Sequence, residues 1–169
     1  NKLTDEEIWK LIEDDAILQY TGLLKGFITR CRQIGWDSEK LGQKISLQAA
    51  DGKSVEGLFL KQAGYMFGAY ETTLKAKRET DFSKLIADAV QQIESGATAF
   101  YRRSGNGNLG SLRYVFVDEF QDFSFLFDSM VKAIFNINNQ VSLFCVGDNW
   151  QAINGFAGSD LNYFYNFLE

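Results

Sequence analysis

Two short, mostly apolar runs, each followed within two residues by an acidic residue, constrain the fold of this chain more than any other feature. The first run spans residues 112–117 and leads into Asp118, and the second spans 141–146 and leads, after one glycine, into Asp148. Between them, residues 123–135 have the apolar pattern of a helix. The order predicts a βαβ unit with two buried parallel strands. Both acids then lie at the same edge of one sheet.

The rest of the chain is predicted to be helical. Apolar residues recur at helical spacing in the segments 4–34, 38–44, 55–78 and 82–93. Thr4 is a predicted helix cap, as is the pair Thr80-Asp81. The glycine- and asparagine-rich segment 104–110 is predicted to be a flexible loop. The predicted fold class is α/β, with an all-helical subdomain over residues 1–79 and parallel strands within residues 80–169.

Composition excludes several kinds of chemistry. The 169 residues include no His, which removes the commonest general base and zinc ligand, and the net charge of −5 excludes a basic field over the whole domain. Cys31 and Cys145 lack the spacing of a metal or redox site. No apolar run is long enough to cross a bilayer, and the N-terminus does not read as a signal peptide. We therefore expect a cytoplasmic protein without a membrane partner.

The residues that follow the two strands carry the predicted chemistry. At a strand end, Asp118 is suited to hold Mg²⁺ through water, and Glu119 to polarise an attacking water molecule. The alternative is that these acids are solvated loop residues. For the loop after Val146, the alternative is an ordinary connection that packs Trp150 and Phe156 into the core.

Together the two segments resemble the UvrD/Rep family of superfamily 1 DNA helicases. Asp-Glu-Phe-Gln-Asp at 118–122 is similar to motif II of that family, a Walker B variant, and Gly-Asp-x-x-Gln-x-Ile-x-x-Phe-x-Gly at 147–158 is similar to motif III. Asp81-Phe82-x-x-Leu85-Ile86 looks like the helix that precedes motif II. The resemblance implies a partial RecA-like P-loop NTPase domain at 80–169 and, by position, a helical insertion at 1–79.

The resemblance also implies a role for individual residues of the nucleotide site. Asp118 would coordinate Mg²⁺, and Glu119 would orient or deprotonate the water that attacks the γ-phosphate of ATP. Gln151 would sense the γ-phosphate, and Asp148 would support the same crevice.

Other residues are expected to contact DNA or to couple DNA to the nucleotide site. By resemblance, Gln121 and Asp122 would provide the coupling, and Phe156 would stack on a single-stranded base. The basic clusters of the chain are either solvated faces or phosphate contacts. The preferred contact cluster consists of Lys75, Lys77 and Arg78. A second cluster, Arg102-Arg103, has Tyr101 beside it as a stacking ring.

A phosphate-cradling Gly-x-x-x-x-Gly-Lys-Thr/Ser loop is required before motif II, and this chain does not contain one. Gly52-Lys53-Ser54 lacks the first glycine, because Leu47 occupies its position. We therefore expect part of an ATP-dependent DNA helicase or translocase, with a role such as DNA repair, that is inactive in isolation.

The expected partners are ATP, Mg²⁺, single-stranded or duplex-junction DNA, and the remainder of the parent helicase chain. Two alternatives stay open. One is the motor segment of a helicase-nuclease or phage-defence complex, and the other is a non-catalytic nucleic-acid-binding module.

Overall fold

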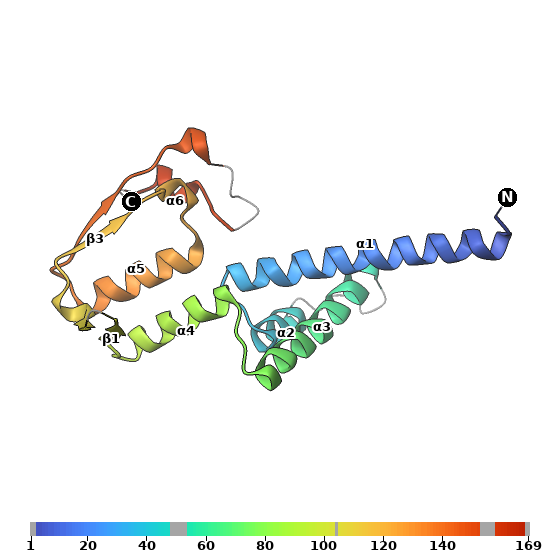
Figure 1. Cartoon of the computed structure of the whole chain (residues 1–169), viewed down its shortest axis with the longest axis horizontal. Coiled ribbons are helices and arrows are strands. Elements are labelled where there is room, and N and C mark those ends of the chain that lie inside the picture. Colours follow the sequence, from blue (N-terminus) through green and yellow to red (C-terminus); the bar gives the residue numbers. More distant parts are fainter. Residues whose placement is uncertain (1–2, 48–53, 104, 153–157, 168–169) are drawn as a thin grey trace. The chain divides into compact units, whose positions relative to one another are not determined.

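The computed structural model of the chain describes residues 3–47, 54–103, 105–152 and 158–167. The chain forms two compact units, which are Asn1–Arg32 with Trp36–Arg78, and Gln33–Gly35 with Glu79–Glu169. The first unit is helical, and the second combines helices with a small parallel sheet (Figure 1). No helix among the described residues has the length and apolarity to span a membrane.

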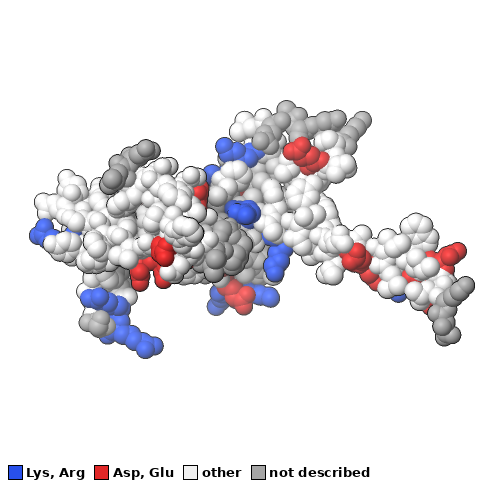
Figure 2. All heavy atoms as spheres, turned by 90° about the horizontal axis from the view of Figure 1, so that it is seen from above, with Lys and Arg blue, Asp and Glu red and all other residues white. Residues whose placement is uncertain are grey.

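The first unit contains three helices, α1 (Asp5–Gln33), α2 (Ser38–Leu47) and α3 (Val55–Lys77). These confirm the predicted helices. The Thr4 hydroxyl accepts a hydrogen bond from the Glu7 N–H at 3.3 Å, and the Glu7 carboxylate accepts one from the Thr4 N–H at 2.7 Å. This reciprocal capping box fixes the start of α1 and lowers the pKa of Glu7. Acidic side chains gather along the N-terminal part of α1 (red, right of Figure 2).

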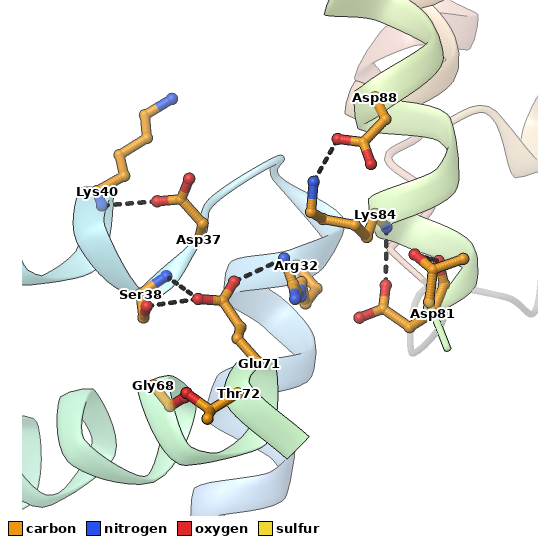
Figure 3. A network of polar contacts seen from close by, with 11 residues as sticks. Arg32, Asp37, Ser38, Lys40, Gly68, Glu71, Thr72, Asp81, Lys84 and Asp88 are labelled. Atoms are coloured by element: carbon orange, nitrogen blue, oxygen red, sulfur yellow. Dashed lines mark hydrogen bonds and ion pairs between the residues drawn. The ribbon is translucent and has the colours of Figure 1, made fainter. Parts of the chain in front are cut away.

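A buried ion pair holds the three helices of the first unit together (Figure 3). The Arg32 Nη1 atom lies 3.0 Å from the Glu71 Oε1 atom, and these side chains are 8% and 23% exposed. The guanidinium also lies over the Phe67 ring, 5.0 Å from its centroid. Glu71 accepts hydrogen bonds from the N–H of Ser38, at 3.2 Å, and from its hydroxyl. One carboxylate on α3 therefore contacts both α1 and the first residue of α2.

The second unit contains the helices α4 (Phe82–Glu94), α5 (Phe125–Ile137) and α6 (Asn162–Tyr165), the strands β1 (Ala99–Arg102), β2 (Gly105–Asn108), β3 (Tyr114–Val117) and β4 (Ser142–Cys145), and the 3-10 turns η1 (Leu109–Ser111), η2 (Phe120–Asp122) and η3 (Asn149–Gln151). Strands β3 and β4 are parallel, with Val117 opposite Cys145 and α5 between them in sequence. The predicted βαβ unit is confirmed. The predicted cap of α4 is also confirmed, since the Asp81 carboxylate accepts a hydrogen bond from the Lys84 N–H at 2.7 Å.

The prediction that both strands are buried is wrong for one face of the sheet. Successive side chains of a strand point to opposite faces. The side chains on the inner face pack against the hydrophobic cores of the unit. They belong to Val115, Val117, Leu143 and Cys145. The outer side chains Tyr114, Phe116 and Phe144 are exposed, and the last two rings lie edge to face at 5.8 Å. Helix α5 covers only the inner face, so the apolar run alone overestimated burial.

The segment predicted to be a flexible loop contains a strand, β2. Strands β1 and β2 form an antiparallel hairpin in which Phe100 lies opposite Gly107 and Arg102 opposite Gly105. A Cβ atom at position 107 would lie 2.1 Å from the Phe100 ring. The glycine therefore makes room for an aromatic ring, a cross-strand contact that turn composition does not reveal.

The C-terminal helix is shorter than predicted from the Ser159-Asp160 cap. Helix α6 has four residues, and the Asp160 carboxylate accepts a hydrogen bond from the Asn162 N–H at 2.9 Å. Tyr163 and Phe164 pack against the buried rings of Phe120 and Phe123. This aromatic cluster supports the turn that carries the motif II acids.

Candidate active site

Backbone hydrogen bonds hold the two acid-bearing loops side by side beyond the ends of the strands. The Val146 N–H donates to the Val117 carbonyl at 2.9 Å, and the Phe120 N–H donates to the Val146 carbonyl at 2.8 Å. The parallel ladder therefore continues past β3 and β4. This brings Asp118 and Asp148 to the same edge of the sheet, as the sequence predicts.

The turn between Asp118 and Glu119 has an unusual backbone conformation. Glu119 adopts the left-handed region, with φ of 52° and ψ of 44°. This conformation costs a residue with a side chain about 1–2 kcal/mol. The Asp118 carboxylate accepts a hydrogen bond from the Glu119 N–H at 2.9 Å, which stabilises the turn. Both carboxylates are exposed and accessible to a ligand.

The Gln121 side chain connects the two loops. Its amide Nε2 donates to the Glu119 carboxylate at 2.5 Å, and its Oε1 accepts from the Asp148 N–H at 2.9 Å. Only 2% of Gln121 is exposed. Because a buried amide is costly unless its polar atoms are hydrogen-bonded, these contacts fix the position of Glu119 relative to the second loop.

The close approach of the two loops requires a glycine at position 147. A Cβ atom there would lie 2.6 Å from the Gln121 Oε1, 2.9 Å from the Phe120 backbone nitrogen and 3.0 Å from that of Gln121. Two of these atoms belong to the backbone, so a side-chain rotation cannot remove the clash. Gly147 belongs to the motif III pattern, but the sequence alone assigned no structural role to this glycine.

Gly147→Ala is expected to destabilise the protein by about 1–3 kcal/mol, the usual cost of an extra methyl group in a closely packed site. Urea unfolding followed by circular dichroism measures this change. Gly26→Ala is the control, because nothing lies within 4 Å of a Cβ atom at that position of α1. The control should gain up to about 1 kcal/mol from helix propensity. Equal effects of the two substitutions would contradict the close approach.

The second loop is organised by Asp148. One of its carboxylate oxygens accepts a hydrogen bond from the Trp150 N–H at 3.0 Å, and the other accepts one from the Gln151 Nε2 at 3.1 Å. The Asn149 Nδ2 donates to the Tyr165 hydroxyl at 3.0 Å, which ties the turn to α6. Trp150 is 92% exposed, so the alternative that packed this ring into the core is wrong.

The donor set at this edge fits a magnesium ion shared with a phosphate ligand. Among the described residues, no three acidic or sulfur side chains form a closed metal cage. Mg²⁺ commonly keeps several waters and binds through one or two carboxylates plus substrate phosphates, and exposed Asp118 meets that need. Burial raises the pKa of the nearby Cys145 thiol, which disfavours a nucleophilic role for it.

The structure brings together five of the predicted site residues, namely Asp118, Glu119, Gln121, Asp148 and Gln151. Asp122 lies in η2 and is half-buried. The predicted DNA-contacting cluster lies in the other unit, where Lys75 and Lys77 occupy the last turn of α3 and Arg78 is its left-handed cap, all three exposed. Phe156 lies outside the described residues. The bridging contacts of Gln121 are a tertiary feature that its place in the motif did not disclose.

The two acid-bearing loops lie at the carboxyl ends of parallel strands, where open α/β sheets bind their ligands. Residues 3–169 match the family described as UvrD/REP helicase N-terminal domain. The chain is also 30% identical, over 176 residues, to DNA helicase IV of Escherichia coli (strain K12), an alignment that covers 99% of this chain and 23% of the relative. The chain belongs to the UvrD/REP helicase family and spans about a quarter of the length of this curated relative.

Proposed function

We propose that this chain supplies the catalytic acids and the phosphate sensor of an ATP-dependent DNA helicase or translocase. The observation that supports this proposal most directly is that Gln121 links Glu119 in motif II to the Asp148 backbone in motif III. The Asp148 carboxylate in turn accepts a hydrogen bond from the Gln151 side chain. The family membership supports the same activity. Because the chain spans about a quarter of its relative, the activity is proposed for the full-length protein.

The proposed division of labour follows from position. Asp118 holds Mg²⁺, which neutralises phosphate charge, and Glu119 accepts a proton from the attacking water. Gln151 contacts the γ-phosphate, and Gln121 and Asp122 relay its presence toward the DNA. Gln121 is hydrogen-bonded both to the Asp148 N–H and to the Glu119 carboxylate. A movement of the second loop would therefore move Gln121, and Gln121 would in turn move Glu119.

We propose that residues 80–169 are part of a RecA-like domain and that residues 1–79 are a helical insertion. Purely parallel sheets are normally covered on both faces. The exposed aromatic face of Tyr114, Phe116 and Phe144 is consistent with this, since other parts of the full-length protein would cover it. The DNA contacts proposed for Phe156, Lys75, Lys77 and Arg78 belong to the same assignment.

The test is to assay the full-length protein that contains this chain for ATP hydrolysis with and without single-stranded DNA, and for separation of a partial duplex. We expect hydrolysis that requires Mg²⁺ and is stimulated by the DNA. DNA binding without any ATP turnover would favour the non-catalytic module instead. Cleavage of the DNA by the same protein would favour the helicase-nuclease alternative.

A further inference from the structure

The charge of the second unit is unevenly distributed along the sequence. Segment 79–169 contains eleven acidic and five basic residues, but segment 95–117 contains three arginines and no acid. Two of these arginines, Arg102 and Arg103, lie at the end of β1 where the chain turns toward β2.

These two arginines differ from the other basic residues of the unit in having no hydrogen-bonded or ionic side-chain partner among the described residues. Lys84 pairs with Asp88 on α4, and Lys132 lies 2.9 Å from Asp128 on α5. The remaining one, Arg113, donates to the Gln140 side chain at 3.0 Å. The hairpin therefore presents uncompensated positive charge in an otherwise acidic unit, which is the electrostatic condition for binding a polyanion.

An exposed aromatic ring accompanies this charge. Tyr101 is 81% exposed and lies opposite Asn106 in the hairpin. Its neighbours Phe100 and Arg102 point to the other face, and Phe100 closes against Gly107. A two-stranded hairpin is one layer thick, so a strand of nucleic acid that crosses its tip can contact Tyr101 on one face and the arginines at the turn.

The base of the hairpin is fixed to the core, so its tip is presented on a rigid support. The Leu109 N–H donates to the Thr98 carbonyl at 2.8 Å, which closes the hairpin. The buried Asn138 donates through Nδ2 to the carbonyls of Leu109, at 3.2 Å, and Leu112, at 2.8 Å. Both leucines pack against the core that α4 and α5 form.

We propose that the β1–β2 hairpin is a binding site for single-stranded DNA, in which the Tyr101 ring stacks on a base while Arg102 and Arg103 contact phosphates. The proposal rests on the proposed DNA-dependent function but assigns a separate contact site. The hairpin precedes the amino end of β3 in the chain, whereas the acids follow its carboxyl end, and the four-residue strand between them is itself about 13 Å long. DNA affinity and ATP chemistry should therefore respond separately to substitutions.

The experiment uses the full-length protein and a labelled single-stranded oligonucleotide, with affinity measured by fluorescence anisotropy from 50 to 300 mM salt. Arg102→Gln with Arg103→Gln should reduce the slope of log affinity against log salt by about 1.4, because each single-strand phosphate contact contributes about 0.7. Tyr101→Leu should weaken binding at least about fivefold, and Tyr101→Phe should restore it, since stacking needs only the ring.

The matched control is Lys84→Gln with Lys132→Gln, which removes the same charge from α4 and α5 and should leave the slope unchanged. The rate of ATP hydrolysis at saturating DNA should stay at the wild-type value in all hairpin variants. The concentration of DNA that gives half-maximal stimulation should rise in the double arginine variant and in Tyr101→Leu.

An unchanged slope in the double arginine variant overturns the proposal, and the charge then serves another partner such as an acidic protein surface. The single-strand assignment is overturned if the arginine substitutions weaken binding to single-stranded and duplex DNA equally and Tyr101→Leu does not weaken binding. If wild-type protein binds DNA through the hairpin but hydrolyses no ATP, the site stands and the proposed motor function fails. If wild-type protein does not bind DNA, both fail.

Discussion

Glu119→Gln in the full-length protein is expected to lower the rate of ATP hydrolysis by about 10²- to 10⁴-fold, the usual contribution of a positioned general base. Glutamine keeps the shape of the side chain and an oxygen that accepts the hydrogen bond from the Gln121 Nε2. It loses the ability to accept a proton from the attacking water. ATP binding should therefore persist, and a filter-binding assay for nucleotide beside a phosphate-release assay separates the two effects.

Glu94→Gln is the matched control for this substitution. Glu94 is the exposed last residue of α4, and its replacement removes the same charge outside the site. Its hydrolysis rate should equal that of the wild type. Turnover on single-stranded DNA that survives Glu119→Gln undiminished would show that the acid is wrongly assigned.

Glu71→Ala is expected to lower the free energy of unfolding by about 3 kcal/mol, at the lower end of the range for breaking a buried ion pair. The substitution removes the Glu71 carboxylate from the Arg32 guanidinium, which is 8% exposed, and it also removes both hydrogen bonds from Ser38. We expect a value at the lower end of this energy range because 23% of the Glu71 side chain is exposed to solvent. Urea unfolding followed by circular dichroism measures the change.

Two further variants show whether burial causes this effect. Glu71→Gln keeps an oxygen for Ser38 but removes the charge, so its loss of stability should be smaller than that of Glu71→Ala. Asp88→Ala breaks an exposed pair with Lys84 one helical turn away, and pairs of this kind contribute about 0.3–0.5 kcal/mol. If Glu71→Ala costs no more than Asp88→Ala, the ion pair of the first unit has no special role in its stability.

Local signals in the sequence predicted the main elements of the fold. Helical spacing located α1, α3 and α4, and the caps at Thr4 and Asp81 have the hydrogen bonds that their residue types imply. The two apolar runs predicted the parallel pairing of β3 with β4. These predictions succeeded because periodicity and capping depend on residues within about one helical turn or one strand.

Contacts between distant residues account for the predictions that failed. The predicted loop contains a strand of a hairpin, and glycine at position 107 leaves room for the Phe100 ring on the opposite strand. The exposed outer face of β3 depends on which helices cover the sheet, and a run of apolar residues does not specify that. The sequence left open that Trp150 is a core residue, because a large aromatic side chain is often buried. Only the structure shows that this side chain is 92% exposed.

The sequence by itself determined which residues we propose to carry the chemistry, because acids at strand ends and the spacing of the two motifs are local properties of the chain. Tertiary structure alone decided how these residues are joined. The Gln121 amide reaches Glu119 on one side and the Asp148 backbone on the other, and the glycine at position 147 leaves room for it. Hydrogen bonds of this kind depend on distances between loops that are 27 residues apart in the chain, and only packing of the βαβ unit sets those distances.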